Sequence, residues 1–260
     1  MRPIGGISLS EPKKQNYLHG AAILAAGVVI MKILGFIYKV PLGNILGDEG
    51  YTHFLVAYNI YSVFLTVATA GLPVALSRMI SEANTMNRPN QVKRIFSVAW
   101  LTFLVLGVVC TLVMFLFPTE LADSLNDVEA SQSILALSPA VLLVCLTSAY
   151  RGYCQGHENM KPTTVGQVLE VLVKVVVGLV LAWYLRDLGR SLPLVSAGAI
   201  FGVTAGSLAA LVYMFAYKRR CYSALPAGND VPESGARIVS TLLKVGIPIT
   251  LGSSVLSLIN

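Results

Sequence analysis

Long apolar runs, separated by short charged segments, are the dominant pattern of the chain. Four of them contain no charged residue and cover 54–77, 95–119, 130–150 and 191–217. Each exceeds the roughly 20 residues that a helix needs to cross the ~30 Å hydrocarbon layer of a bilayer. Two further runs, about 17–39 and 163–185, contain charged residues, and a seventh begins near Arg237 and is still apolar at Asn260. Because the runs are continuous rather than alternating, β-barrel strands are not expected. The pattern predicts an all-α integral membrane protein with six complete transmembrane helices and the start of a seventh.

The composition agrees with this interpretation and excludes two classes of protein. Charged residues make up 12% of the 260 residues and hydrophobic residues 55%, whereas a soluble domain usually has about 25% charged residues. A disordered chain is excluded because disorder requires low hydrophobicity. The net charge of +6 could indicate nucleic acid, but in so apolar a chain membrane lipids or a phosphorylated membrane substrate are the expected acidic partners.

The cations are concentrated in alternate connections between the apolar runs. Thirteen lie in the N-terminal segment and in every second connection: Arg2, Lys13, Lys14, Arg78, Arg88, Lys93, Arg94, Arg151, Lys161, Lys218, Arg219, Arg220 and Arg237. The opposite connections contain Arg186 and Arg190, with Lys39 at the end of a run. Because short cytoplasmic loops carry the excess of Lys and Arg, we expect a multi-pass membrane protein with a cytoplasmic N-terminus.

The same pattern divides the chain into four parts. They are a cytoplasmic tail (1–16), a six-helix lobe (17–217), a cytoplasmic loop (218–236) and the start of a seventh helix (237–260). A helix that ends half-way across the bilayer would leave polar backbone groups in lipid. We therefore expect a truncated gene product or the first half of a longer chain.

Ionisable residues inside the apolar runs are the first candidates for function, because each costs about 2.5–3.5 kcal/mol at the centre of a membrane helix. Lys32 lies within the first run, and Lys39 follows two turns later on the same face. We expect Lys32 to point into the helical bundle, whereas Lys39 either joins it or extends to the outer interface. Glu170 and Lys174 are spaced i, i+4 in the fifth run. They either neutralise each other on one helix, or they face a cavity and contact a substrate.

Milder polar and small residues mark two more helices. Asn59 belongs to a polar face of the second run, which either bonds neighbouring helices or contributes to the same cavity. The sequence Gly71-Leu72-Pro73 is expected to bend or break that helix. Gly198, Gly202 and Gly206 form a doubled GxxxG motif, which is typical of close packing between membrane helices.

Signatures of catalysis and of metal binding are missing from the sequence. It contains no phosphate-binding GxxxxGK[ST] loop, no HExxH and no GxSxG. The three histidines are far apart in sequence, and the four cysteines have no zinc-type spacing. We expect a protein that is not an enzyme and that needs no cofactor or metal.

Several segments resemble one family of membrane proteins. They are KILGFIYKVPL (32–42), LGDEG (46–50), ATAGLPVALS (68–77), AYRGYCQGHENMKPT (149–163) and QVLEVLVKVVVG (167–178). These segments are similar to the polysaccharide-biosynthesis flippases related to stage V sporulation protein B. That group belongs to the multidrug/oligosaccharidyl-lipid/polysaccharide (MOP) exporter superfamily, which also contains the lipid II flippase.

The resemblance implies a MATE/MOP-type transporter with two six-helix lobes around a central cavity, of which this chain would be the N-terminal lobe. It implies translocation of an undecaprenyl-pyrophosphate-linked saccharide or peptidoglycan precursor for cell-wall, polysaccharide or spore-cortex synthesis. In the lipid II flippase, first-helix arginines line the cavity, and Lys32 stands at one such position. The expected substrate-binding residues are Lys32, Lys39, Asn59, Glu170 and Lys174. The alternatives are a cation-coupled multidrug exporter, with Glu170 as its ion-responsive carboxylate, or a half-lobe that does not transport.

Overall fold

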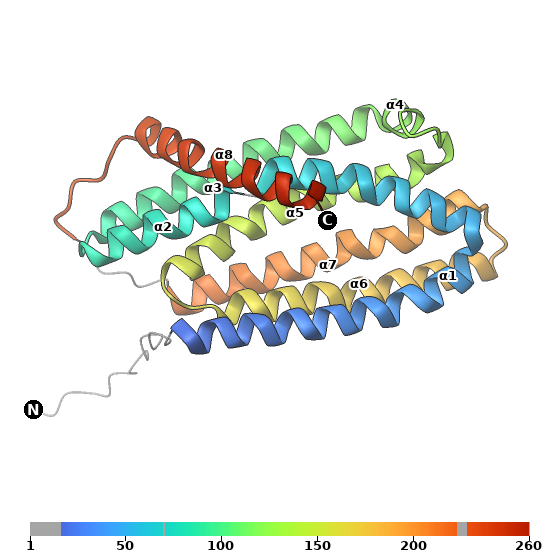
Figure 1. The fold of residues 1–260 in the computed structure, drawn as a ribbon, viewed down its shortest axis with the longest axis horizontal. Helices are drawn as coiled ribbons and strands as arrows, with labels where there is room; N and C mark the ends of the chain where they lie inside the picture. Colours follow the sequence, from blue (N-terminus) through green and yellow to red (C-terminus); the bar gives the residue numbers. More distant parts are fainter. Residues whose placement is uncertain (1–16, 70, 223–227, 260) are drawn as a thin grey trace, which may run out of the picture.

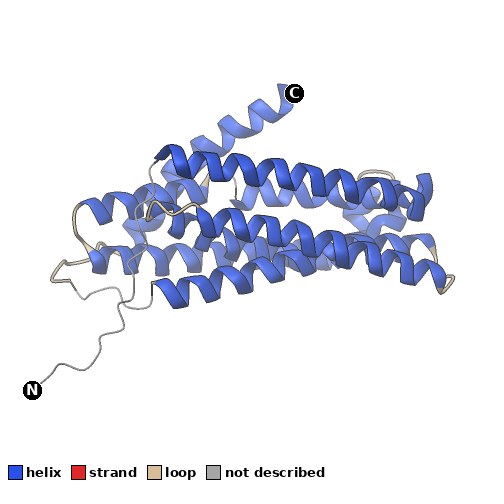
Figure 2. Ribbon diagram, turned by 90° about the horizontal axis from the view of Figure 1, so that it is seen from below, coloured by secondary structure: helices blue, strands red, loops and turns tan. Residues whose placement is uncertain are grey.

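The computed structural model describes residues 17–69, 71–222 and 228–259, and every regular element in these ranges is helical. The helices are α1 (Tyr17–Thr69), α2 (Leu72–Thr85), α3 (Pro89–Leu116), α4 (Pro118–Asp123), the 3₁₀ helix η1 (Val128–Ala130), α5 (Ser131–Gly156), α6 (Lys161–Asp187), α7 (Leu192–Cys221) and α8 (Gly235–Ile259). They form an elongated bundle of roughly parallel rods (Figures 1 and 2). The expected tail, 1–16, lies outside the described residues.

Five helices of the described part are long and apolar enough to cross a membrane. One of them is α1, whose apolar stretch of 45 residues includes the turn at Gly47. Gly47 has φ +66° and ψ −174°, a conformation that only glycine adopts readily. Figure 1 shows that α1 runs along the bundle, reverses at its far end and runs back toward the end at which it began. The sequence pattern leaves a loop of about 14 residues between the first two runs, but the turn is made almost entirely at this glycine.

The other boundaries also differ in part from the sequence pattern. The expected second helix, 54–77, is interrupted between Thr69 and Leu72, where Gly71 and Pro73 were expected to bend it. The expected loop 218–236 is helical at both ends, because α7 continues to Cys221 and α8 begins at Gly235. Lys218, Arg219 and Arg220 thus form the last turn of α7.

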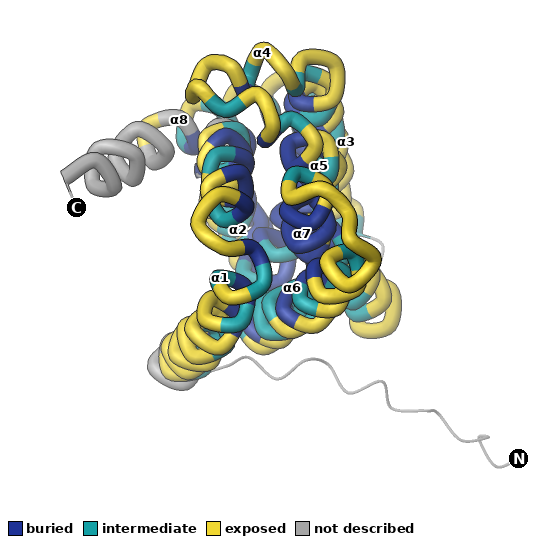
Figure 3. The backbone as a smooth tube through the Cα atoms, turned by 90° about the vertical axis from the view of Figure 1, so that its right-hand side faces the viewer, coloured by how far each residue is buried: buried dark blue, intermediate teal, exposed yellow. Residues whose placement is uncertain are grey.

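The centre of the bundle is α5, which packs mainly against α7 and α3. Most of the apolar residues of α5 are buried, whereas those of α1 and α6 are mostly half-buried or exposed. Figure 3 shows exposed residues along the outer faces of the bundle and buried residues facing its interior. Many outward side chains are large and apolar, such as Val109 and Phe115 on α3 and Trp183 on α6. An exposed apolar band of this kind suits a lipid environment.

Glycines allow α6 and α7 to approach closely. A Cβ added to Gly202 would lie 2.5 Å from the backbone oxygen of Lys174, and one added to Gly206 would collide with the backbone oxygen of Glu170. On α5, a Cβ on Gly152 would lie 2.8 Å from the backbone oxygen of Pro73. The GxxxG motif of α7 therefore packs within the bundle, as its spacing predicts. The same contacts set the position of Glu170 and Lys174 along the bundle axis relative to α7.

Candidate substrate-binding site

Lys174 lies between α6 and the two halves of α1. Its Nζ atom is 5.5 Å from the ring centroid of Tyr38, on the first half of α1, and 5.1 Å from that of Tyr58, on the return half. Both distances are within the range of a cation–π contact. The hydroxyl of Tyr38 donates a hydrogen bond of 3.2 Å to the backbone oxygen of Ala199 on α7. Lys174 is thus half-buried against two aromatic rings that are themselves positioned by packing.

Glu170 is paired with a residue from another helix. One of its carboxylate oxygens is 2.5 Å from Nη2 of Arg151 on α5, and the other accepts a hydrogen bond of 3.3 Å from the hydroxyl of Ser207 on α7. The side chains of Arg151 and Glu170 are 15% and 20% exposed. Glu170 therefore makes its direct ion pair with Arg151 and not with Lys174, although its charge still acts on Lys174 one turn away. Arg151, which the loop pattern assigns to a connection, lies within α5 and compensates the carboxylate.

The remaining expected site residues lie on exposed parts of α1. Lys32 and Lys39 are both exposed, so the expectation that Lys32 points into the bundle of this lobe is wrong. Asn59 is also exposed, next to Tyr58 in the chain. In the part of the chain that the structure describes, no carboxylate lies within 4.0 Å of Lys32, Lys39 or Lys174. The structure groups Lys174 with Tyr38 and Tyr58, and Glu170 with Arg151 and Ser207, whereas Lys32, Lys39 and Asn59 stand apart from these contacts.

The charges of these groups favour an anionic ligand. The Arg151–Glu170 pair is neutral as a unit, and Lys174, in the middle of α6, has no carboxylate within 4.0 Å among the described residues. Charge-assisted hydrogen bonds from such a cation to phosphate oxygens are roughly twice as strong as neutral ones. Sequence reasoning missed Arg151, Tyr38 and Tyr58 as members of this site. Tyr58 lies next to Asn59, and Tyr38 and Arg151 lie within the family-like segments 32–42 and 149–163, but none of these patterns assigned them to the site.

Comparison with known proteins places these helices in a family. A family model described as "Polysaccharide biosynthesis protein" matches residues 17–260. Stage V sporulation protein B of Bacillus subtilis (strain 168) is 30% identical over 241 residues, which are 91% of this chain and 46% of that protein. Lipid II flippase MurJ of the same organism is 28% identical over 210 residues, which are 77% of this chain and 39% of that protein. The chain thus spans about half the length, or less, of these relatives.

Solved structures show the same fold at low sequence identity. A MOP superfamily transporter from Pyrococcus furiosus superposes with a TM-score of 0.71 and 18% identity, over 93% of this chain and 55% of that one. A MATE structure in the straight conformation gives a TM-score of 0.73 and 17% identity, over 96% and 57%. The resemblance seen in the sequence is confirmed by the family match and by the fold. The chain belongs to the polysaccharide biosynthesis protein family and has the helical fold of MOP superfamily transporters.

Proposed function

We propose that this chain forms the N-terminal lobe of a flippase that translocates a polyprenyl-pyrophosphate-linked saccharide or peptidoglycan precursor by alternating access. In this proposal α1 crosses the bacterial cytoplasmic membrane twice, reversing at Gly47, so the lobe has six passes and α8 starts a seventh. A second lobe completes the cavity, and its surface lies opposite the exposed side chains of Lys32 and Lys39. The lobe performs no chemical reaction on its substrate.

The observation that carries the proposal is the state of Lys174. Its ammonium group lies against two aromatic rings and has no carboxylate within 4.0 Å over the described ranges, while the nearest carboxylate on its own helix, that of Glu170, is in direct contact with Arg151. A pyrophosphate would supply the missing counter-charge, and its oxygens would accept hydrogen bonds from the ammonium group. The apolar exterior of the bundle leaves the polyprenyl tail in lipid.

The proposed orientation follows from the distribution of cations over the two ends of the bundle. The α2–α3, α5–α6 and α7–α8 connections lie at one end, together with the start of α1 (Figure 1). Arg88, Lys161 and Arg220 are at that end, whereas Glu49, Glu129 and Asp187 are at the other. Under the positive-inside rule the first end is cytoplasmic.

A cation-coupled drug exporter is the second candidate, and it requires Glu170 to bind and release an ion. The contacts of Glu170 with Arg151 and Ser207 oppose this role, because its charge is already compensated. The two candidates differ in which substitution matters. Glu170→Gln should abolish drug efflux if the exporter assignment is right, while Lys174→Gln should strongly decrease lipid translocation if the flippase assignment is right.

Translocation is measured with a fluorescent lipid-linked precursor in proteoliposomes. The chain is tested alone and joined to a second lobe from a relative. We expect translocation only with the second lobe, and a large decrease with Lys32→Ala or Lys174→Gln. Translocation at the unsubstituted rate in both variants would refute the assignment. Equal efflux of a drug by the same liposomes would favour the exporter.

A further inference from the structure

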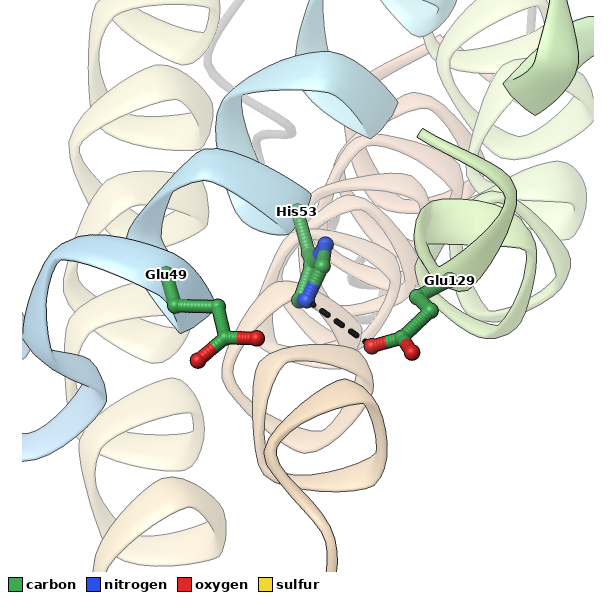
Figure 4. A group of neighbouring side chains, drawn as sticks. All are labelled: Glu49, His53 and Glu129. Atoms are coloured by element: carbon green, nitrogen blue, oxygen red, sulfur yellow. Dashed lines mark ion pairs between the residues drawn. The ribbon is translucent and has the colours of Figure 1, made fainter. Parts of the chain in front are cut away.

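A second cluster of polar side chains lies at the opposite end of the bundle from the α5–α6 connection. Glu49 and His53 come from the return half of α1, just after the turn at Gly47. Asp127 and Glu129 come from the segment around η1, more than 70 residues later. Figure 4 shows the imidazole of His53 between the carboxylates of Glu49 and Glu129.

The orientation of the His53 ring is fixed by Asp127. The Nδ1 atom lies 2.8 Å from both carboxylate oxygens of Asp127. A carboxylate only accepts hydrogen bonds, so Nδ1 carries the proton and Nε2 of the neutral ring presents a lone pair. Asp127 is itself held in place, since its side chain accepts a hydrogen bond from the backbone N–H of Ala130. A carboxylate behind a histidine in this way is the usual outer partner of a metal-binding imidazole.

The Nε2 atom is the unsatisfied member of the cluster. The side chain of His53 is 7% exposed, and Nε2 is buried without a hydrogen-bond partner. It points toward Glu129, whose Oε2 atom is 3.4 Å away but is not aligned for a hydrogen bond. A buried nitrogen without a partner is unfavourable, because it has lost its hydrogen bonds to water. Because Nε2 points toward the carboxylates of Glu49 and Glu129, the ligand that would satisfy all three groups is a cation.

The spacing of the three groups matches a metal centre. Potential ligand atoms of Glu49, His53 and Glu129 all lie within 4.8 Å of one another. Bonds of about 2.0–2.1 Å in tetrahedral geometry hold neighbouring ligand atoms roughly 3.3–3.4 Å apart. The distance from His53 Nε2 to Glu129 Oε2 is already 3.4 Å. The side chains of Glu49 and Glu129 are exposed, so Glu49 can close the remaining gap by rotation and the ion can enter from water.

We propose that Glu49, His53 and Glu129 bind a first-row transition-metal dication of the Zn²⁺ class, with Asp127 orienting the histidine and water as the fourth ligand. One imidazole and two carboxylates favour Zn²⁺ over Mg²⁺ or Ca²⁺, which prefer sites made of oxygen alone. The bound ion joins the turn of α1 to the start of α5. This site is separate from Lys174 and does not depend on the proposed translocation activity.

The test is titration of the purified 260-residue chain in detergent with Zn²⁺, Mn²⁺, Mg²⁺ and Ca²⁺, followed by calorimetry and thermal unfolding. We expect one Zn²⁺ per chain, a raised Tm, and weaker binding of Mg²⁺ and Ca²⁺. His53→Ala and Glu129→Gln should each abolish stoichiometric binding, and Asp127→Asn should weaken it roughly 10–100-fold. Glu129→Gln changes an exposed side chain, so its result does not depend on refolding of the core.

Two controls separate this site from other binding. Glu120→Gln, an exposed carboxylate on α4, should leave the affinity unchanged. X-ray absorption of the Zn²⁺ form should show only N and O ligands near 2.0–2.1 Å, whereas a Zn–S distance of about 2.3 Å would indicate Cys221, the exposed thiol of the described residues. The proposal is overturned if a sulfur ligand is found or if Zn²⁺ does not bind stoichiometrically. It is also overturned if His53→Ala and Glu129→Gln bind Zn²⁺ as tightly as the unsubstituted chain.

Discussion

Replacing Arg151 by Met should leave Glu170 as an uncompensated carboxylate within the bundle. The two groups are in direct contact at 2.5 Å, and their side chains are only 15% and 20% exposed. Methionine keeps most of the apolar stem of arginine, so packing changes little while the guanidinium is removed. The loss of stability then reports mainly on the ion pair.

The expected loss follows from the distance and the burial of the pair. Two unit charges about 4 Å apart interact by about 4 kcal/mol at an effective dielectric constant of 20, and removing one partner of a buried pair typically costs 3–5 kcal/mol. Because some water reaches both groups, we expect Arg151→Met to lower the free energy of unfolding by about 3 kcal/mol. Adding Glu170→Gln removes the stranded charge, so the double variant should lose only about 1 kcal/mol.

The assay is a double-mutant cycle of reversible denaturation in mixed micelles. The exposed pair Arg237–Glu233, with a distance of 3.6 Å and side chains 74% and 34% exposed, is the control, and Arg237→Gln should cost less than about 0.5 kcal/mol. Single substitutions at Arg151 and Glu170 whose effects simply add, with a coupling free energy below about 0.5 kcal/mol, would refute the reasoning.

Two further predictions concern packing and the polar end of α3. Gly206→Ala should lower the free energy of unfolding by about 1–3 kcal/mol, because its methyl group would collide with the backbone of α6. A Cβ added to Gly35 has nothing within 4 Å, so Gly35→Ala should have no such cost. Thermal unfolding of both variants compares them. Desolvation raises the pKa of Asp230, but hydrogen bonds from the backbone N–H groups of Gln91 and Asn90 outweigh it and lower the pKa below its ordinary value. The protection that Asp230 gives these two amides should be present above pH ~4, disappear as the pH falls through the lowered pKa, and be absent at every pH in Asp230→Ala. Hydrogen exchange measures it, and equal protection in both proteins at pH 7 would contradict it.

The sequence was sufficient for those features of the fold that local pattern determines. Apolar runs located the helices because each must cover a bilayer with apolar residues, and Gly71 with Pro73 located the break before α2. The spacing of Gly202 and Gly206 predicted close packing. The reversal of α1 was missed as a tight turn, because the adjacent charged residues Asp48 and Glu49 resemble an ordinary polar loop.

The partners of the polar side chains could not be predicted, because they depend on contacts between helices. Spacing along α6 suggested that Glu170 pairs with Lys174, but the bundle brings Arg151 closer to Glu170. Lys174 meets tyrosines from both halves of α1 only because that helix reverses at Gly47. His53 and Asp127 are 74 residues apart, and no local pattern connects them.

The most direct test of the proposed function is the binding of undecaprenyl pyrophosphate to this chain, measured by native mass spectrometry. We expect binding that requires the pyrophosphate, with undecaprenol as the neutral control, and that weakens about 10- to 100-fold in Lys174→Gln, equivalent to about 1.5–3 kcal/mol. Glu129→Gln, at the other polar cluster, should bind like the unsubstituted chain. Equal binding of undecaprenol and undecaprenyl pyrophosphate, or an unchanged affinity in Lys174→Gln, would contradict the proposal.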